Sequence, residues 1–210
     1  MNWRLASRLS VITLAILVVI LVTVIQQHKA VSTTNNSTGA GTAVGMRGTD
    51  LENTPAPDFR LTDQFGKQVS LSQFKGKPVV LTFLYTHCPD VCPVTAEHLH
   101  TTMQQLGSAA HGVAVLAVST DPRRDDMNAA LSFSKTHNMQ DYWHFLIGTQ
   151  QELAPVWTHY SVSARQIQGK INHSTAVYVI DRQGHERVYL GDDFTPAQLA
   201  SDLNILLNEK

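Results

Sequence analysis

The sequence contains few cysteines and few charges, and neither sign of charge is in excess. Cysteine occupies only two of the 210 positions, so at most one disulfide can form within the chain. Charged residues make up 16% and the formal net charge is −1, so there is no basic stripe of the kind that binds nucleic acid, and none is expected as a partner. Hydrophobic residues make up 43%, which is the balance of a globular chain rather than a disordered one.

An apolar run without charges predicts a membrane anchor near the N-terminus. Leu9–Ile25 contains 17 residues and would span roughly 26 Å as a helix, close to the thickness of a bilayer core. Arg4 and Arg8 precede it, which favours a cytoplasmic N-terminus. A cleaved signal peptide is the alternative, although its apolar region is usually about 7–15 residues long. We predict an anchor in residues 1–29, a single pass through the inner (cytoplasmic) membrane, and a domain on the periplasmic or extracytoplasmic side.

Residues 30–55 are rich in Ser, Thr, Asn and Gly, which predicts a flexible linker. The remaining residues, 56–210, alternate between strand and helix patterns. Strands are expected at 59–62, 67–70, 78–85, 112–119, 143–147, 175–180 and 187–190, and helices at 93–106, 125–137, 150–160 and 196–207. This order predicts an α/β fold, a thioredoxin-like sandwich with helices on both faces of a central sheet and an N-terminal hairpin insert.

The two cysteines lie in the run Cys88-Pro89-Asp90-Val91-Cys92, between an expected strand and an expected helix that opens at Pro93. Sites in parallel α/β sheets form at the carboxyl ends of strands. A helix N-terminus also lowers the pKa of a nearby thiol. We therefore expect reactive thiols of lowered pKa at this end of the sheet.

The spacing of the cysteines distinguishes between their possible roles. A pair separated by two residues at a helix start is the thioredoxin-type redox motif, whereas three residues intervene here. A disulfide across so short a loop would constrain little of the unfolded chain, so a redox or metal role gains weight over a structural one. Two thiolates suit Cu(I), and an added imidazole makes a three-coordinate site that also holds Cu(II). Zinc is the second choice, because structural zinc needs a fourth ligand.

Residue spacing does not choose the third ligand among the ten histidines. His173 lies at the entrance of an expected strand, and His87 adjoins Cys88, but a lone histidine is more often a surface or packing residue. Two carboxylates belong to the same region. Asp90 lies between the cysteines, and Asp121 follows the strand expected at 112–119. Each is interpreted either as a residue that tunes the site or as an ordinary turn residue.

Three motifs, in this order, resemble the SCO/SenC family. They are Phe83-x-x-Thr86-His87-Cys88-Pro89-Asp90-Val91-Cys92-Pro93, then Ser119-Thr120-Asp121-Pro122-Arg123-Arg124-Asp125, then His173-Ser174. The resemblance covers about residues 57–207, and its C-P-D-V-C-P run is highly specific. It implies a membrane-anchored, thioredoxin-fold copper protein with Cys88, Cys92 and His173 as ligands. Asn172 stands where the family commonly has an acidic residue, which removes no ligand.

The resemblance implies a metallochaperone that helps to load the binuclear copper centre of cytochrome c oxidase. The expected cargo is copper, Cu(I) or Cu(II). The expected partners are the copper-bearing subunit of that oxidase or of a similar membrane oxidase, and other copper carriers. The alternative is a thiol–disulfide oxidoreductase in which Cys88 and Cys92 reduce the cysteines of a partner. A peroxidase is a weaker interpretation, because such enzymes often space their two cysteines far apart.

Overall fold

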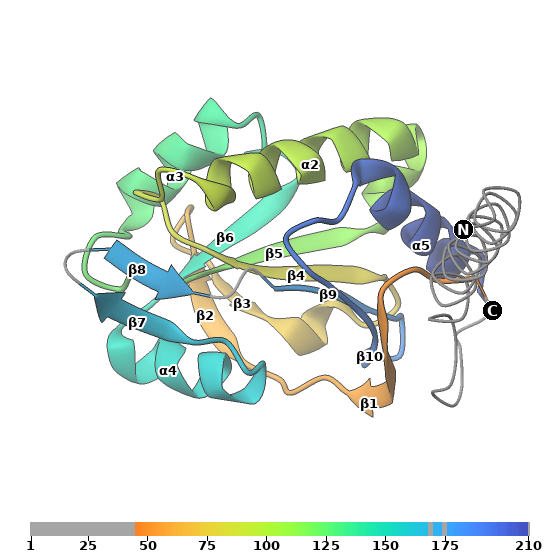
Figure 1. Cartoon of the computed structure of the whole chain (residues 1–210), viewed down its shortest axis with the longest axis horizontal. Helices are drawn as coiled ribbons and strands as arrows, with labels where there is room; N and C mark the ends of the chain where they lie inside the picture. Colours follow the sequence, from red (N-terminus) through yellow and green to blue (C-terminus); the bar gives the residue numbers. More distant parts are fainter. Residues whose placement is uncertain (1–44, 168–169, 174–175, 210) are drawn as a thin grey trace, which may run out of the picture. The chain divides into compact units, whose positions relative to one another are not determined.

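Figure 1 shows the computed structural model, which describes residues 45–167, 170–173 and 176–209. The predicted anchor, Leu9–Ile25, and the first part of the predicted linker lie outside the described residues. Within the described part, no helix is long and apolar enough to cross a membrane.

Among the described residues, eight strands form one mixed sheet in the order β1-β10-β9-β4-β5-β6-β2-β3 (Figure 1). These strands are β1 (Thr49–Pro55), β2 (Arg60–Asp63), β3 (Gln68–Ser70), β4 (Val79–Leu84), β5 (Ala114–Ser119), β6 (Trp143–Ile147), β9 (Val177–Ile180) and β10 (His185–Leu190). Strands β4, β5 and β6 are parallel, and β9 is antiparallel to β4. Every residue of β4 and β5 is buried, as their apolar runs predict for central strands.

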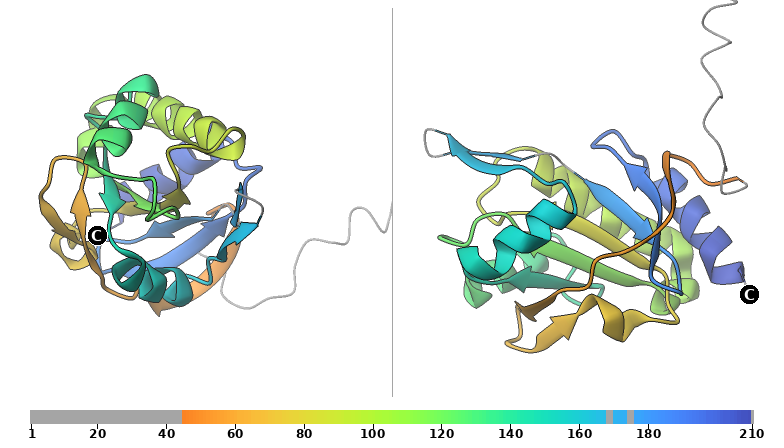
Figure 2. Two further views of the ribbon diagram at one scale, coloured as in Figure 1. Left: turned by 90° about the vertical axis from the view of Figure 1, so that its left-hand side faces the viewer. Right: turned by 90° about the horizontal axis from the view of Figure 1, so that it is seen from below.

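Helices cover both faces of the sheet, which confirms the layered α/β architecture. One face packs against α2 (Val91–Leu106), α3 (Met127–Thr136) and α5 (Pro196–Asn208), whereas the other packs against α4 (Gln150–His159) and the short 3-10 helix η1 (Leu71–Phe74). A second 3-10 helix, η2 (Gly107–Gly112), follows α2. Figure 2 shows the sheet between these two helical layers. Each face has its own apolar core, and the first of these two cores includes both cysteines.

The start of α2 differs from the sequence-based prediction. The helix begins at Val91, two residues before Pro93, so Cys92 lies in its first turn rather than ahead of it. A proline is compatible with the first turn because the N–H groups there have no partner within the helix. The Cys92 backbone is therefore helical, which fixes the direction of its side chain.

Strand β1 lies inside the stretch that composition predicts as linker, residues 30–55. Thr49–Pro55 pairs with β10 at the edge of the sheet, and most of its side chains are exposed. Composition gives little signal for such a strand, because backbone hydrogen bonds to β10 hold it and Leu51 is its one aliphatic side chain packed on the core. The folded domain therefore begins ahead of residue 56.

The chain enters the described domain against α5. The N–H of Arg47 donates to Oδ1 of Asp202 at 2.8 Å, and the Asp202 side chain is fully buried. The next residue, Gly48, has a φ of +122° and lies so close to β10 that a Cβ there would be 2.6 Å from the Tyr189 carbonyl oxygen. A glycine is required at that position. In Figure 1 this entry lies on the right, whereas the loop between β4 and α2 lies on the left.

A two-stranded hairpin, β7 (Ala164–Ile167) with β8 (Lys170–His173), precedes β9 and was not predicted. The strands are antiparallel, and residue 164 pairs with residue 173. In Figure 1 the hairpin lies on the left. It brings the chain back to the sheet at Val177, which pairs with Thr82 near the carboxyl end of β4.

Candidate functional site

The cysteine loop, residues 85–90, connects the carboxyl end of β4 to α2. Cys88 is 8% exposed and Cys92 is fully buried, and both are thiols. The Cys92 N–H points at the sulfur of Cys88, with an N···Sγ distance of 3.4 Å. The Cys88 N–H donates to the carbonyl oxygen of Tyr85 at 3.3 Å, which closes the turn. The loop thus brings two sulfur atoms together at the end of a central strand, as the motif predicts.

Burial controls the acidity of the Cys92 thiol. It raises the pKa of Cys92 far above the usual range, and the hydrogen bond that Cys92 shares with the Cys88 side chain raises it further. This overturns the sequence-based expectation of a lowered pKa. The first turn of α2 supplies a partial positive charge, but a fully desolvated thiolate costs more than that dipole returns. In the metal-free protein Cys92 is therefore held as a neutral thiol.

Tyr85, the first residue of the cysteine loop, contacts both Cys88 and the loop that follows β5. Its side chain is hydrogen-bonded to that of Cys88, and burial together with this bond raises the pKa of Tyr85 to about 12. The guanidinium of Arg124 lies 5.9 Å from the centre of the Tyr85 ring, within the range of a cation–π contact. Arg124 in turn forms an ion pair with Asp121. A continuous set of contacts therefore runs from Asp121 to the Cys88 thiol.

The two carboxylates that the sequence selected occupy different environments. Asp121 is 1% exposed and follows β5, at the expected edge of the sheet, but its carboxylate pairs with Arg124 rather than with a cysteine. Asp90 is exposed at the start of α2, and its side chain makes no capping hydrogen bond there. The Asp121 carboxylate therefore acts on the loop through Arg124, and Asp90 stands at the solvent side of the cysteine loop.

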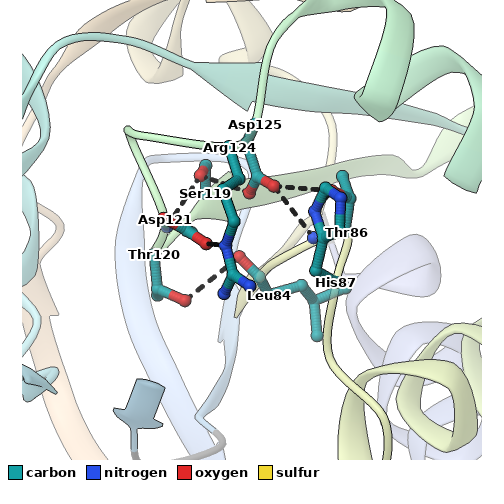
Figure 3. A network of polar contacts seen from close by, with 8 residues as sticks. All are labelled: Leu84, Thr86, His87, Ser119, Thr120, Asp121, Arg124 and Asp125. Carbon is teal, nitrogen blue, oxygen red and sulfur yellow. Dashed lines mark hydrogen bonds and ion pairs between the residues drawn. The ribbon is translucent and has the colours of Figure 1, made fainter. Parts of the chain in front are cut away.

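A third carboxylate, Asp125, makes the direct contact with the cysteine loop, and sequence reasoning missed it (Figure 3). Its Oδ1 accepts hydrogen bonds from the Thr86 hydroxyl at 2.7 Å and from the Thr86 N–H at 3.1 Å. Its Oδ2 accepts from the Ser119 hydroxyl at 2.6 Å. Burial raises the pKa of Asp125, although these hydrogen bonds act in the opposite direction. The signal was present as the last residue of the S-x-D-P-x-x-D motif.

The backbone of His173 ends β8, four residues before Val177 of β9. Because Val177 pairs with Thr82, the β8–β9 connection reaches the sheet at the end where the cysteine loop lies. The His173 side chain lies outside the described residues, and the described side chains alone form no cluster of three metal-binding groups. The other histidine considered from the sequence, His87, adjoins Cys88. It is exposed, and its Nδ1 is 2.9 Å from the Thr86 hydroxyl.

The arrangement suits two kinds of chemistry. Two sulfur atoms in contact can bind one soft metal ion once their protons leave, and they can also form a disulfide without a large movement of the backbone. A structural disulfide is less suited to this loop, because the two cysteines are only four residues apart.

Comparison with known proteins identifies the family. The SCO1/SenC family model matches residues 48–208. The human protein SCO2 homolog is 28% identical over 158 residues, which cover 70% of this chain and 57% of the human one. The SCO1 protein homolog of Bacillus subtilis is 26% identical over 72% of this chain and 82% of its own length. The chain thus spans little more than half of the human relative.

Solved structures give the same answer. Bradyrhizobium japonicum ScoI with copper bound is 32% identical with a TM-score of 0.66, and the match covers 73% of this chain and 99% of that one. Apo Sco1 from Thermus thermophilus is 29% identical with a TM-score of 0.68, over 79% of this chain and 99% of that one. The fold is thioredoxin-like, and the residues that the SCO1/SenC family model matches include the cysteine loop, residues 85–90. The chain belongs to the SCO1/SenC family.

Proposed function

We propose that the protein binds copper through Cys88, Cys92 and His173 and delivers it to a membrane oxidase. The observation that carries this proposal is the contact between the two cysteines at the carboxyl end of β4, with 3.4 Å from the Cys92 nitrogen to the Cys88 sulfur. Two thiolates and an imidazole form a soft donor set that suits copper. The similar ScoI of Bradyrhizobium japonicum holds copper, which supports the same cargo here.

Proton release is part of the proposed copper binding. Because the pKa of Cys92 is raised, the thiol keeps its proton until a metal displaces it. Copper bound by sulfurs at the end of the sheet can pass to a partner by stepwise ligand exchange, in which each new sulfur or nitrogen replaces one of the three ligands. Cys88, which is slightly exposed, is the ligand that such a partner reaches first.

We propose the copper-bearing subunit of cytochrome c oxidase, or of a similar membrane oxidase, as the recipient, and another copper carrier as the donor. A Sco protein of fold similar to this chain is described as a member of a family of cytochrome c oxidase assembly proteins, which supports this recipient. The charge-free run Leu9–Ile25 supports an anchor in the inner membrane, with the domain on its periplasmic or extracytoplasmic side.

A copper titration tests the ligand set. The full chain, purified in detergent with its thiols reduced, is titrated with Cu(I) against a competing chelator. We expect about one copper per chain, loss of tight binding in Cys88→Ser and Cys92→Ser, and a tenfold or greater weakening in His173→Ala, since ligand loss removes a donor that no water replaces well. His159→Ala, which removes an exposed histidine on α4, is the matched control and should bind like the wild type. Equal binding by His173→Ala and the control would remove His173 from the site.

The hydrogen bond between the two thiols favours a second function, thiol–disulfide exchange. In that reaction the Cys88 thiolate attacks a partner's disulfide, forms a mixed disulfide and releases one partner thiolate. The Cys92 thiol then gives its proton to the departing partner sulfur as its own sulfur attacks that of Cys88, which releases the second partner thiol. The partner gains two electrons, and the chain is left as the Cys88–Cys92 disulfide. Under this function Cys88→Ser and Cys92→Ser abolish the exchange, whereas His173→Ala leaves its rate unchanged.

A further inference from the structure

We propose that Asp125 is a positioning residue that holds the cysteine loop in the pose that binds copper; this inference rests on the proposed function. The carboxylate is 6% exposed and accepts three hydrogen bonds from two separate segments (Figure 3). Two come from Thr86, in the cysteine loop, and one comes from Ser119, at the end of β5. Asp125 therefore ties the loop to the central sheet.

The tie acts close to the first sulfur. Thr86 lies two residues before Cys88, within the turn that the Cys88 N–H closes on the Tyr85 carbonyl oxygen. When Thr86 is fixed through both its N–H and its hydroxyl, the turn on which Cys88 stands has little freedom to rotate. The position of the Cys88 sulfur relative to Cys92, which is fixed by α2, therefore depends on the carboxylate.

Asp125 is itself held by hydrogen bonds, so it can fix the position of the cysteine loop relative to the sheet. Its N–H donates to the Asp121 carbonyl oxygen at 3.0 Å, and the Asp121 N–H donates to the Ser119 hydroxyl oxygen at 3.0 Å. The Ser119 hydroxyl thus accepts from one aspartate and donates to the other. This closed arrangement leaves the Asp125 carboxylate one orientation.

The Asp125 carboxylate offers two oxygen atoms, and both accept hydrogen bonds here. In Asp125→Asn one oxygen becomes an NH₂ group, which cannot accept, so the hydrogen bonds to either Thr86 or Ser119 lose their acceptor. Thr86→Val keeps the shape of the threonine and removes only its hydroxyl, whereas Thr86→Ser keeps the hydroxyl. The three variants therefore separate the hydrogen bonds from the packing.

Copper binding by the full chain in detergent tests the inference, with Cu(I) affinity and the thiolate-to-Cu(II) absorption band as readouts. We expect Asp125→Asn to weaken Cu(I) binding by about 10- to 100-fold and Thr86→Val by about 10-fold, the range found when residues that orient metal ligands are changed. Both variants should also shift the absorption band, which reports the sulfur–copper geometry. Thr86→Ser, which keeps the hydroxyl, should retain the wild-type Cu(I) affinity and absorption band.

Asp63→Asn is the matched control. Asp63 is likewise a buried carboxylate, but its partners are the N–H groups of Phe65 and Lys67 and the ring of His144, in the β2–β3 turn and β6. Its loss should lower stability and leave the copper band unchanged. The inference is overturned if the wild type binds copper and both Thr86→Val and Asp125→Asn match its Cu(I) affinity and absorption band. If Asp125→Asn does not fold, the result for Thr86→Val decides alone. A wild type that binds no copper would instead refute the proposed function.

Discussion

Replacing Asp202 by asparagine should change how the stability of the domain depends on pH. Asp202 is fully buried on α5, where its Oδ1 accepts the Arg47 N–H at 2.8 Å. Its Oδ2 has no hydrogen-bond partner among the described residues. Burial raises the pKa of Asp202 from 3.8 to about 6, although the Arg47 N–H and the Arg47 charge act in the opposite direction. The folded protein therefore binds the Asp202 proton more tightly than the unfolded chain does.

The sign and size of the effect follow from this difference. The protonated form favours folding, so its contribution is complete below the pKa of the unfolded chain and is lost as the pH rises through about 6. At about 1.4 kcal/mol for each pKa unit, the loss amounts to about 3 kcal/mol at neutral pH. Asparagine carries no charge at any pH and keeps the oxygen that accepts from Arg47, so Asp202→Asn avoids this loss.

Urea unfolding of the wild type and of Asp202→Asn, measured between about pH 4 and pH 7, isolates the contribution of this one group. The stability of the variant relative to the wild type should rise across that range by about 2–3 kcal/mol. Asp192→Asn, which replaces an exposed aspartate, is the control for the loss of one carboxylate from the surface. Parallel curves for Asp202→Asn and the wild type would refute a buried, uncompensated carboxylate at this position.

Two further predictions concern the thiols and the core. When the reduced protein is treated with iodoacetamide at neutral pH, mass spectrometry should find Cys88 modified well before Cys92. The reason is that Cys92 is fully buried and its pKa is raised. Equal rates of modification would contradict the geometry of the loop. Tyr160→Phe should lower the free energy of unfolding by about 1–2 kcal/mol, because it removes the 2.8 Å hydrogen bond from the hydroxyl to the Pro57 carbonyl oxygen. A change below the error of urea unfolding would show that this partly buried hydrogen bond makes no net contribution to stability.

The central sheet and the place of the cysteines were predictable from the sequence. Apolar runs at 78–85 and 112–119 identify buried strands, and a strand followed by a helix places the intervening loop at the carboxyl end of the sheet. Strand β1 was not predictable in the same way, because its exposed side chains leave no periodic apolar pattern and only its pairing with β10 defines it.

The chemistry around the thiols depended on contacts that sequence spacing does not encode. Asp121 and Asp125 lie four residues apart in one turn, and the motif contains both, but only the folded chain shows that Asp125 reaches Thr86 while Asp121 pairs with Arg124. The pKa of Cys92 likewise follows from complete burial, which overrides the effect of the helix terminus. Local sequence predicted the helix start, within two residues, but not the depth of the sulfur.

The segment around Arg47, which packs against α5, lies away from the route by which another protein would reach the sulfur atoms. The first described residues rest on Asp202, at the opposite end of the view in Figure 1 from the loop that leads into α2. A protein that docks over Cys88 therefore meets the carboxyl ends of the central strands and not the segment around Arg47.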